Sequence, residues 1–240
     1  MAEDIKTEDR RSFLGIDEKI TYYLAAPTAE DIRGADWNYS KMFTKSLTEG
    51  ITTSHEMMDI LMRRGVIGPE FEQRTAELSE ILNTKIMELE IAGTMEEKRE
   101  LSMEVAQSRE ELFQWNQRLN GPMSNTCEQI ADDSRLEYLT SCMVQDEDGN
   151  KIWNDYDTFL REKSQALALR ARFEVMLYLQ GLESNFLEQT PEAKAMKEVE
   201  SDILDKTDAA LKAAEAVVEE EKVTAVKKSA PTKRATKKKK

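Results

Sequence analysis

Apolar residues recur along most of this chain at the three- and four-residue spacing of amphipathic helices, and its few glycines and prolines fall mainly where such helices must begin or end. Thr28 and Asp31 fit the pattern of an N-terminal capping box, and Gly50 follows the apolar stretch after them. We therefore expect a helix over residues 28–49. Gly34 is a weak point inside it, because glycine is a poor helix former.

A second capping box, Thr53 with Glu56, predicts a short helix that ends at Gly65. Residues 69–120 then consist of strong helix formers, interrupted only at Gly93-Thr94. In the second half, the seam positions step by 4, 3, 4, 3 and 4 residues, which is typical of a helix packed along another helix. These positions are Leu101, Val105, Ser108, Leu112, Trp115 and Leu119. We predict an antiparallel helical hairpin; one unbroken helix is the alternative, since an internal glycine costs only about 1 kcal/mol.

The pattern changes after a further short helix expected over residues 127–139. Residues 138–145 and 151–153 read as strands, and they flank an Asp148-Gly149 pair of the kind that tight hairpin turns favour. We therefore expect a β-hairpin near residues 138–153. A hairpin of this size is not stable alone, so it must pack on neighbouring helices.

The chain is predicted to return to helix after the hairpin. Asn154 or Asp155 caps that return, and residues 164–182, the most apolar segment, should form a buried central helix. Residues 191–221 are rich in Ala, Glu and Lys and carry only a thin apolar stripe. Such a helix is either largely solvated or one half of an intermolecular seam.

Together these patterns predict a mainly α protein: an elongated helical bundle with a long helical hairpin, one small β-hairpin and a disordered basic C-terminal tail. The expected segments are an N-terminal segment 1–27, a helical region 28–120, a helical region with the β-hairpin 121–190, a helix 191–221 and the tail 222–240. The side chains expected in the core include Trp37, Leu112, Trp115, Trp153, Phe173 and Leu177.

Charge is divided unevenly along the chain. Residues 222–240 contain nine Lys and Arg and no carboxylate, whereas the first 221 residues hold all 47 Asp and Glu and only 25 of the 34 Lys and Arg. The tail could bind phosphates without sequence preference and in a salt-sensitive way, or dock on the acidic body of another copy. Its candidate contact residues are Lys227, Lys228, Lys233, Arg234, Lys237, Lys238, Lys239 and Lys240.

Few residues suit catalysis or metal binding. His55 is the only histidine, and with Cys127 and Cys142 it supplies at most three metal ligands. The acidic turn 146–150 does not fit the frame of an EF-hand, and no phosphate-binding glycine motif is present. We therefore predict a protein that is not an enzyme, with no catalytic residues, cofactor, metal or small-molecule substrate.

Two hypotheses about function follow. In the first, the protein is a non-enzymatic assembly component whose helices pair with other copies or with another protein; in the second, it is a nucleic-acid-associated accessory protein held by its tail. The start of the chain lacks the pattern of a signal peptide, and no apolar run is long enough to span a membrane, so we expect a cytoplasmic protein without membrane contacts.

A resemblance bears on this choice. Residues 35–41 (ADWNYSK) and 148–157 (DGNKIWNDYD), together with the acidic helical body and the terminal lysines, look like structural or assembly proteins of large tailed bacteriophages. The resemblance transfers no functional residue. It favours the assembly hypothesis and implies the cytoplasm of an infected bacterium, with the virion as a destination.

Overall fold

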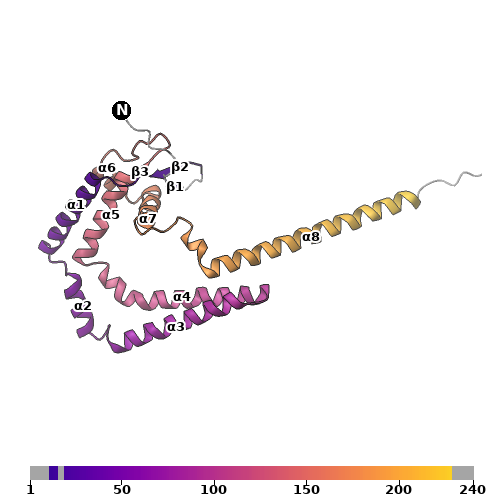
Figure 1. Cartoon of the computed structure of the whole chain (residues 1–240), viewed down its shortest axis with the longest axis horizontal. Helices are drawn as coiled ribbons and strands as arrows, with labels where there is room; N and C mark the ends of the chain where they lie inside the picture. Colours follow the sequence, from indigo (N-terminus) through magenta and orange to yellow (C-terminus); the bar gives the residue numbers. More distant parts are fainter. Residues whose placement is uncertain (1–10, 16–18, 229–240) are drawn as a thin grey trace, which may run out of the picture. The chain divides into compact units, whose positions relative to one another are not determined.

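The computed structural model describes residues 11–15 and 19–228, and the side chains among them up to residue 209. It is mainly helical, as predicted, and it contains a small three-stranded antiparallel sheet where the sequence predicted only a β-hairpin (Figure 1). In chain order, the elements are β1 Arg11–Leu14, β2 Thr21–Leu24, α1 Ala29–Thr48, α2 Ser54–Arg63, α3 Pro69–Ile91, α4 Met95–Met123, α5 Cys127–Met143, β3 Val144–Gln145, α6 Tyr156–Glu162, α7 Ala166–Leu179, a short 3-10 helix Phe186–Gln189, and α8 Pro191–Lys228.

The chain divides into two compact units. The first contains residues up to 84 and residues 106–190, and the second contains residues 85–105 and those from 191 onward. The first unit therefore holds the sheet and most of the helices. The second consists of the far end of the α3–α4 hairpin together with α8.

Both predicted capping boxes are present. The Thr28 N–H donates to the Asp31 carboxylate at 2.9 Å, and the Asp31 N–H donates back to the Thr28 hydroxyl at 3.2 Å. Thr53 and Glu56 make the same reciprocal pair at the start of α2. These local hydrogen bonds satisfy backbone donors that have no partner within the helix, which is why the two N-termini fall where the sequence predicts them.

Helices α1 and α5 pack closely through small side chains. Ala35 is fully buried and Ser46 is 2% exposed on α1, while Ala131 and Ser134 are buried on α5. The prediction that Trp37 lies in the core is wrong, because its side chain is 73% exposed. Two positions on from Ala35, Trp37 falls on the opposite side of α1, and the buried face is set by residues that allow close approach rather than by the largest ones.

The predicted helical hairpin is confirmed, with α3 and α4 side by side and the break between Ile91 and Met95 (Figure 1). In the first unit, the Phe71 and Trp115 rings stack at 5.5 Å, and the Trp115 indole N–H donates to the Thr75 hydroxyl at 3.1 Å. In the second unit, Leu89 of α3 and Val105 of α4 are buried.

Two details of this hairpin differ from the expectation. Helix α4 continues through Pro122 to Met123 instead of ending at residue 120. The proline lies in the last turn, where its missing N–H interrupts little further helix. Leu112 and Trp115, expected in the core, are half-buried, because a pair of helices covers only one side of each.

The β-hairpin is confirmed at its turn, but its first arm is mostly helical. Gly149 has a φ of +84°, and the Asp146 N–H donates to the Asn150 carbonyl at 2.9 Å. Helix α5 runs to Met143, however, so the strand expected from residue 138 begins only at Val144. Hydroxyls within residues 138–143 bond to carbonyls of the helix itself, so an apolar run with Ser and Thr fits a helix here.

The main partner of β3 comes from the N-terminal segment, for which no strand was predicted. Tyr23 and Leu24 of β2 pair with Gln145 and Val144, and β1 pairs with the other edge of β2. This sheet covers one side of the core.

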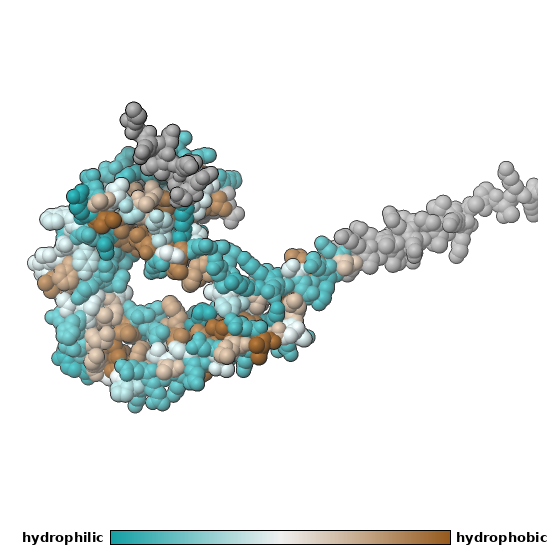
Figure 2. Space-filling view, viewed as in Figure 1, coloured by the Kyte–Doolittle hydropathy of each residue, from teal (hydrophilic) through white to brown (hydrophobic). Residues whose placement is uncertain are grey.

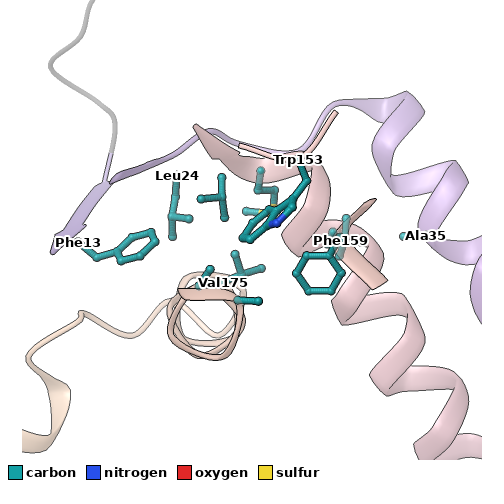
Figure 3. Close-up of a cluster of buried hydrophobic side chains, with 11 residues drawn as sticks. Phe13, Leu24, Ala35, Trp153, Phe159 and Val175 are labelled. Carbon is teal, nitrogen blue, oxygen red and sulfur yellow. The ribbon is translucent and has the colours of Figure 1, made fainter. Parts of the chain in front are cut away.

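The core lies between the sheet, α5, α6 and α7 (Figure 3). Trp153 is 2% exposed and meets the Phe159 ring edge-on at 4.9 Å, with Val175 of α7 close by. The predicted helix is present as α7, but it is buried on one face only. Leu177 is 3% exposed and Phe173 is half-buried, whereas Leu169 is 56% exposed.

Helix α8 extends to Lys228 and so includes residues 222–228, which were assigned to the basic tail. Side chains after residue 209, and all of residues 229–240, lie outside the described residues. The prediction of a disordered tail falls on that part of the chain.

Candidate interaction surface

The eight basic residues that the sequence singled out are not placed as side chains. Lys227 and Lys228 belong to the last turn of α8, whose side chains are outside the described part. Lys233, Arg234 and residues 237–240 lie in the segment that is not described. A site must therefore be sought among residues whose contacts are known.

The second unit offers such a site. Ala195 and Val199 on α8 are 7% and 4% exposed, and the Lys98 amine of α4 pairs with the Glu198 carboxylate. These contacts place the first turns of α8 against the α3–α4 hairpin. A small buried seam therefore holds the start of this long helix.

Beyond Val199, the large apolar side chains of α8 that the structure describes, up to residue 209, are no longer covered. Ile203 is 51% exposed and Leu204 is 66% exposed. Figure 1 shows α8 continuing beyond the tip of the hairpin, where no other element of the second unit lies beside it. Apolar side chains on an uncovered helix are typical of a contact surface for another molecule.

A groove opens at the tip of the hairpin. It has a volume of about 450 Å³, and Ile91, Ala92 and Leu101 form its apolar part. Ile91 is 83% exposed, and the neighbouring Met87 is 67% exposed. Hydrophobic surface is visible along the hairpin and at its tip in Figure 2.

Carboxylates surround this groove. The residues at its rim are Glu88, Glu97, Glu100 and Glu104. Glu97 accepts the backbone N–H groups of Thr94 and Gly93, and the Thr94 bond in particular holds the pKa of Glu97 below its ordinary value. Glu104 lies 3.4 Å from the Lys85 amine. Glu88 and Glu100 are exposed, so the groove combines an apolar floor with negative charge.

The first unit contains a hollow of about 960 Å³ that is lined by several ionisable side chains. It lies between β2, the start of α1, the end of α5 and the segment after the 146–150 turn. Asp31, Tyr138, Cys142 and Lys151 line it, and the Asp31 carboxylate is 3.6 Å from the Lys151 amine.

Three ionisable groups of this hollow, Asp31, Tyr138 and Cys142, have shifted pKa values that leave their ordinary charges at neutral pH unchanged. Burial raises the pKa of the Cys142 thiol and of the Tyr138 hydroxyl, so both keep their protons. Partial burial acts to raise the pKa of Asp31, but hydrogen bonds from the Thr28 side chain and backbone outweigh it and lower that pKa. Asp31 is thus an ionised cap of α1, already occupied by its structural role.

The other candidates for chemistry are separate from one another. The His55 side chain is 89% exposed and lies 3.9 Å from Asp59. Cys127 is buried and donates its S–H to the Ile51 carbonyl at 3.1 Å, whereas Cys142 is only partly buried in the hollow. Within the described residues, no three metal-ligating side chains gather at one point.

Sequence reasoning missed a buried ionic cluster in the first unit. Glu174 of α7 is fully buried, and its carboxylate lies 3.1 Å from Arg11 of β1 and 2.7 Å from Arg170. Ser184 donates to Glu174 at 2.7 Å, and the Arg11 guanidinium also bonds to the Leu182 carbonyl. The four-residue spacing of Arg170 and Glu174 was visible in the sequence, but nothing there pointed to Arg11.

Comparisons with protein-family models, with curated proteins and with solved structures found no match for this chain. Among the residues that the structure describes, no helix combines the length and the apolar character needed to cross a bilayer.

Proposed function

We propose that this protein is a non-enzymatic structural or assembly protein that acts through helix-mediated contacts, chiefly between copies of itself. The observation that carries the proposal is the exposure of Ile203 and Leu204 on α8, directly after the turn that Val199 buries. The helix is held at one end and presents apolar side chains where it has no neighbour in its own unit.

The stability of α8 favours pairing with another helix. An isolated helix in water is marginal, and most helical stability in proteins comes from packing of an apolar face. In the sequence, the stripe continues beyond Ile203 through Ala210, Ala214 and Val217. Burying a side chain such as Ile or Leu contributes about 1.5–3 kcal/mol, so pairing with a second α8 would stabilise both helices.

The hollow of the first unit supports a non-catalytic role. Its charged groups cap or tie together structural elements: Asp31 caps α1, and Asp155 accepts the Thr158 N–H at 2.6 Å at the start of α6. Burial keeps the Cys142 thiol protonated, which is the less nucleophilic form. The side chains there serve the fold.

The resemblance of residues 35–41 and 148–157 to phage proteins supports a more specific form of the proposal. In that form, the chain is a virion component or assembly factor of a tailed bacteriophage, made in the cytoplasm of the infected cell. An acidic, mainly helical chain with uncovered apolar helix positions suits such a role.

A second candidate function rests on the tail. Nine Lys and Arg without a carboxylate in residues 222–240 suit binding to phosphate backbones, whose strength falls steeply with salt. In this alternative the protein is a nucleic-acid-associated accessory protein. Deleting residues 222–240 would then abolish salt-sensitive DNA or RNA binding without changing the oligomeric state.

The main proposal is tested at about 1 M salt, where contacts between charges are screened, by size exclusion with light scattering on the double variant Ile203→Glu/Leu204→Glu. The expected result is a wild-type mass above the 27.5 kDa of one chain and a variant mass close to it. The matched control is Leu47→Glu/Met62→Glu, which changes two apolar residues of similar exposure in the first unit by the same charge. A wild-type chain that is monomeric, or a control that dissociates as fully as the α8 variant, contradicts the proposal.

A further inference from the structure

We propose that the groove at the hairpin tip receives the Lys-rich C-terminal segment, residues 229–240, of a second copy of the chain. This rests on the proposed function in one respect, that copies associate, and it names a contact separate from the α8 seam. The groove is the one described above, lined by Glu88, Ile91, Ala92, Gly93, Glu97, Glu100, Leu101 and Glu104.

The shape of the groove suits an extended segment with small side chains. Its apolar part is shallow, and Ile91 stands almost fully exposed at 83%. Residues 229–240 (SAPTKRATKKKK) contain no bulky side chain apart from Lys and Arg, and they include Ala and Pro near their start. Lys and Arg can lay their aliphatic stems on an apolar surface while the charged end reaches a carboxylate.

The charge of the groove is complementary to the charge of residues 229–240. The groove is lined by four glutamates and by no Lys or Arg, whereas residues 229–240 contain six Lys and Arg and no carboxylate. Glu88 and Glu100 stand exposed at the rim, available to a cationic segment. A phosphate backbone would be repelled from this groove, so its chemistry favours a basic peptide over a nucleic acid.

The segment must come from a second copy, because the tail of the same copy is too short to return to the groove. Glu198 of α8 pairs with Lys98 beside the groove, and α8 then continues to Lys228, a distance of roughly 45 Å at about 1.5 Å per residue. Residues 229–240 span at most about 42 Å when fully extended. A tail turned back along its own helix would be fully stretched and could not place several lysines in the groove.

The association of copies through this contact gives a directional arrangement. The groove of one copy holds the tail of the next, so the contact is head-to-tail and can close into a ring or continue as a chain. The α8 seam is apolar and insensitive to salt, whereas the tail contact weakens as salt screens the charges. Salt therefore separates the two contacts.

A charge-swap experiment with full-length protein tests the proposal. In the groove variant, Glu88→Lys and Glu100→Lys reverse the rim; in the tail variant, Lys237, Lys238, Lys239 and Lys240 are replaced by Glu. The control, Glu72→Lys/Glu80→Lys, makes the same charge change at exposed positions of α3 outside the groove. Association is followed by sedimentation velocity at low salt and at about 1 M salt, where the screening length is about 3 Å.

At low salt, each variant alone should associate about tenfold or more weakly than wild type, because like charges then face one another. An equimolar mixture of the groove and tail variants should recover association, because the lysines at the rim of the groove variant then face the glutamates in the tail of the tail variant. The control should behave as wild type. At high salt, all four proteins should differ little.

Three outcomes separate the claims. If the groove variant, the tail variant and their mixture all have the same mass as the wild type at low salt, the tail contact is overturned and the α8 proposal is unaffected. A wild-type chain that associates only at low salt, with recovery in the mixture, supports the tail contact and contradicts the α8 seam. In the third outcome, association of the tail variant is weaker and the mixture does not recover it. If the protein also binds duplex DNA, and the groove variant binds it equally well, the tail contacts nucleic acid and the proposal is overturned.

Discussion

Gly34 of α1 lies directly against the ring of Tyr138 of α5. A β-carbon on residue 34 would overlap the Tyr138 hydroxyl and come within 2.6 and 2.8 Å of its ring carbons Cζ and Cε1. Atoms of a real side chain do not approach so closely, so the absence of a side chain at this position permits the close packing of α1 on α5. Gly34, expected from the sequence to be a weak point in the helix, is thus part of the close contact between α1 and α5.

Gly34→Ala should therefore destabilise the protein. Alanine would normally stabilise a helix interior by about 1 kcal/mol relative to glycine, but overpacking costs about 1–3 kcal/mol. We expect a net loss in the free energy of unfolding, measured by urea denaturation. In a Tyr138→Ala background the same substitution should cost less, because its obstacle is gone. A gain in stability from Gly34→Ala in the wild type would contradict the close contact.

The two tryptophans Trp37 and Trp153 should respond in opposite ways to truncation. Trp153→Ala removes a side chain that is 2% exposed and should cost about 3–5 kcal/mol. Trp37→Ala removes one that is 73% exposed and should change stability by less than about 0.5 kcal/mol. Thermal unfolding of the two variants at equal concentration distinguishes them. Similar losses for both would mean that Trp37 is covered in solution.

Breaking the buried ion pair of Arg11 should be costly. Arg11→Met leaves the Glu174 carboxylate, fully buried, with one fewer cation, and loss of a buried partner costs on the order of 3 kcal/mol. The comparison is Arg74→Met, which removes an exposed pair with Glu77 and should cost less than about 1 kcal/mol. Denaturant midpoints give both values. If Arg11→Met costs as little as Arg74→Met, the ion pair between Arg11 and Glu174 does not stabilise the protein.

Stability should fall in acid through the capping carboxylates Asp31, Glu56 and Glu97. Hydrogen bonds to backbone and side chains lower the pKa of all three; for Glu56 and Glu97 the backbone bonds from Thr53 and Thr94 are the main cause. A lowered folded-state pKa stabilises the protein above the unfolded value of about 4, and this contribution is lost as the pH falls through the folded value.

The test of this pH dependence is the triple variant Asp31→Asn/Glu56→Gln/Glu97→Gln. An amide can still accept the capping hydrogen bonds but does not titrate. Its melting temperature should therefore fall less than that of the wild type between pH 5 and pH 3. If the two melting curves shift by the same amount over this range, these carboxylates are not the groups responsible.

Local chemistry made much of the fold predictable from sequence. The capping boxes, the break near Gly93 and the turn at Gly149 each depend on residues within a few positions of one another. The arms of the helical hairpin were predictable for a similar reason, since their apolar spacing extends over many turns.

Features that depend on distant residues were not predictable. Residues 138–143 are helical because Leu139 and Met143 pack into the core and because β2 supplies the partner of β3. Burial of small residues, not large ones, on α1 led to the wrong expectation for Trp37. For the candidate site, the sequence indicated the basic tail, but the acidic groove depends on how the end of α3 faces the start of α4.

Sedimentation equilibrium of the intact wild-type chain at about 1 M salt measures whether copies associate through α8, because charge contacts are screened there and apolar helix contacts are not. The mass is expected to rise with protein concentration above the 27.5 kDa of a single chain. A mass that stays at 27.5 kDa over the whole concentration range would contradict assembly through α8.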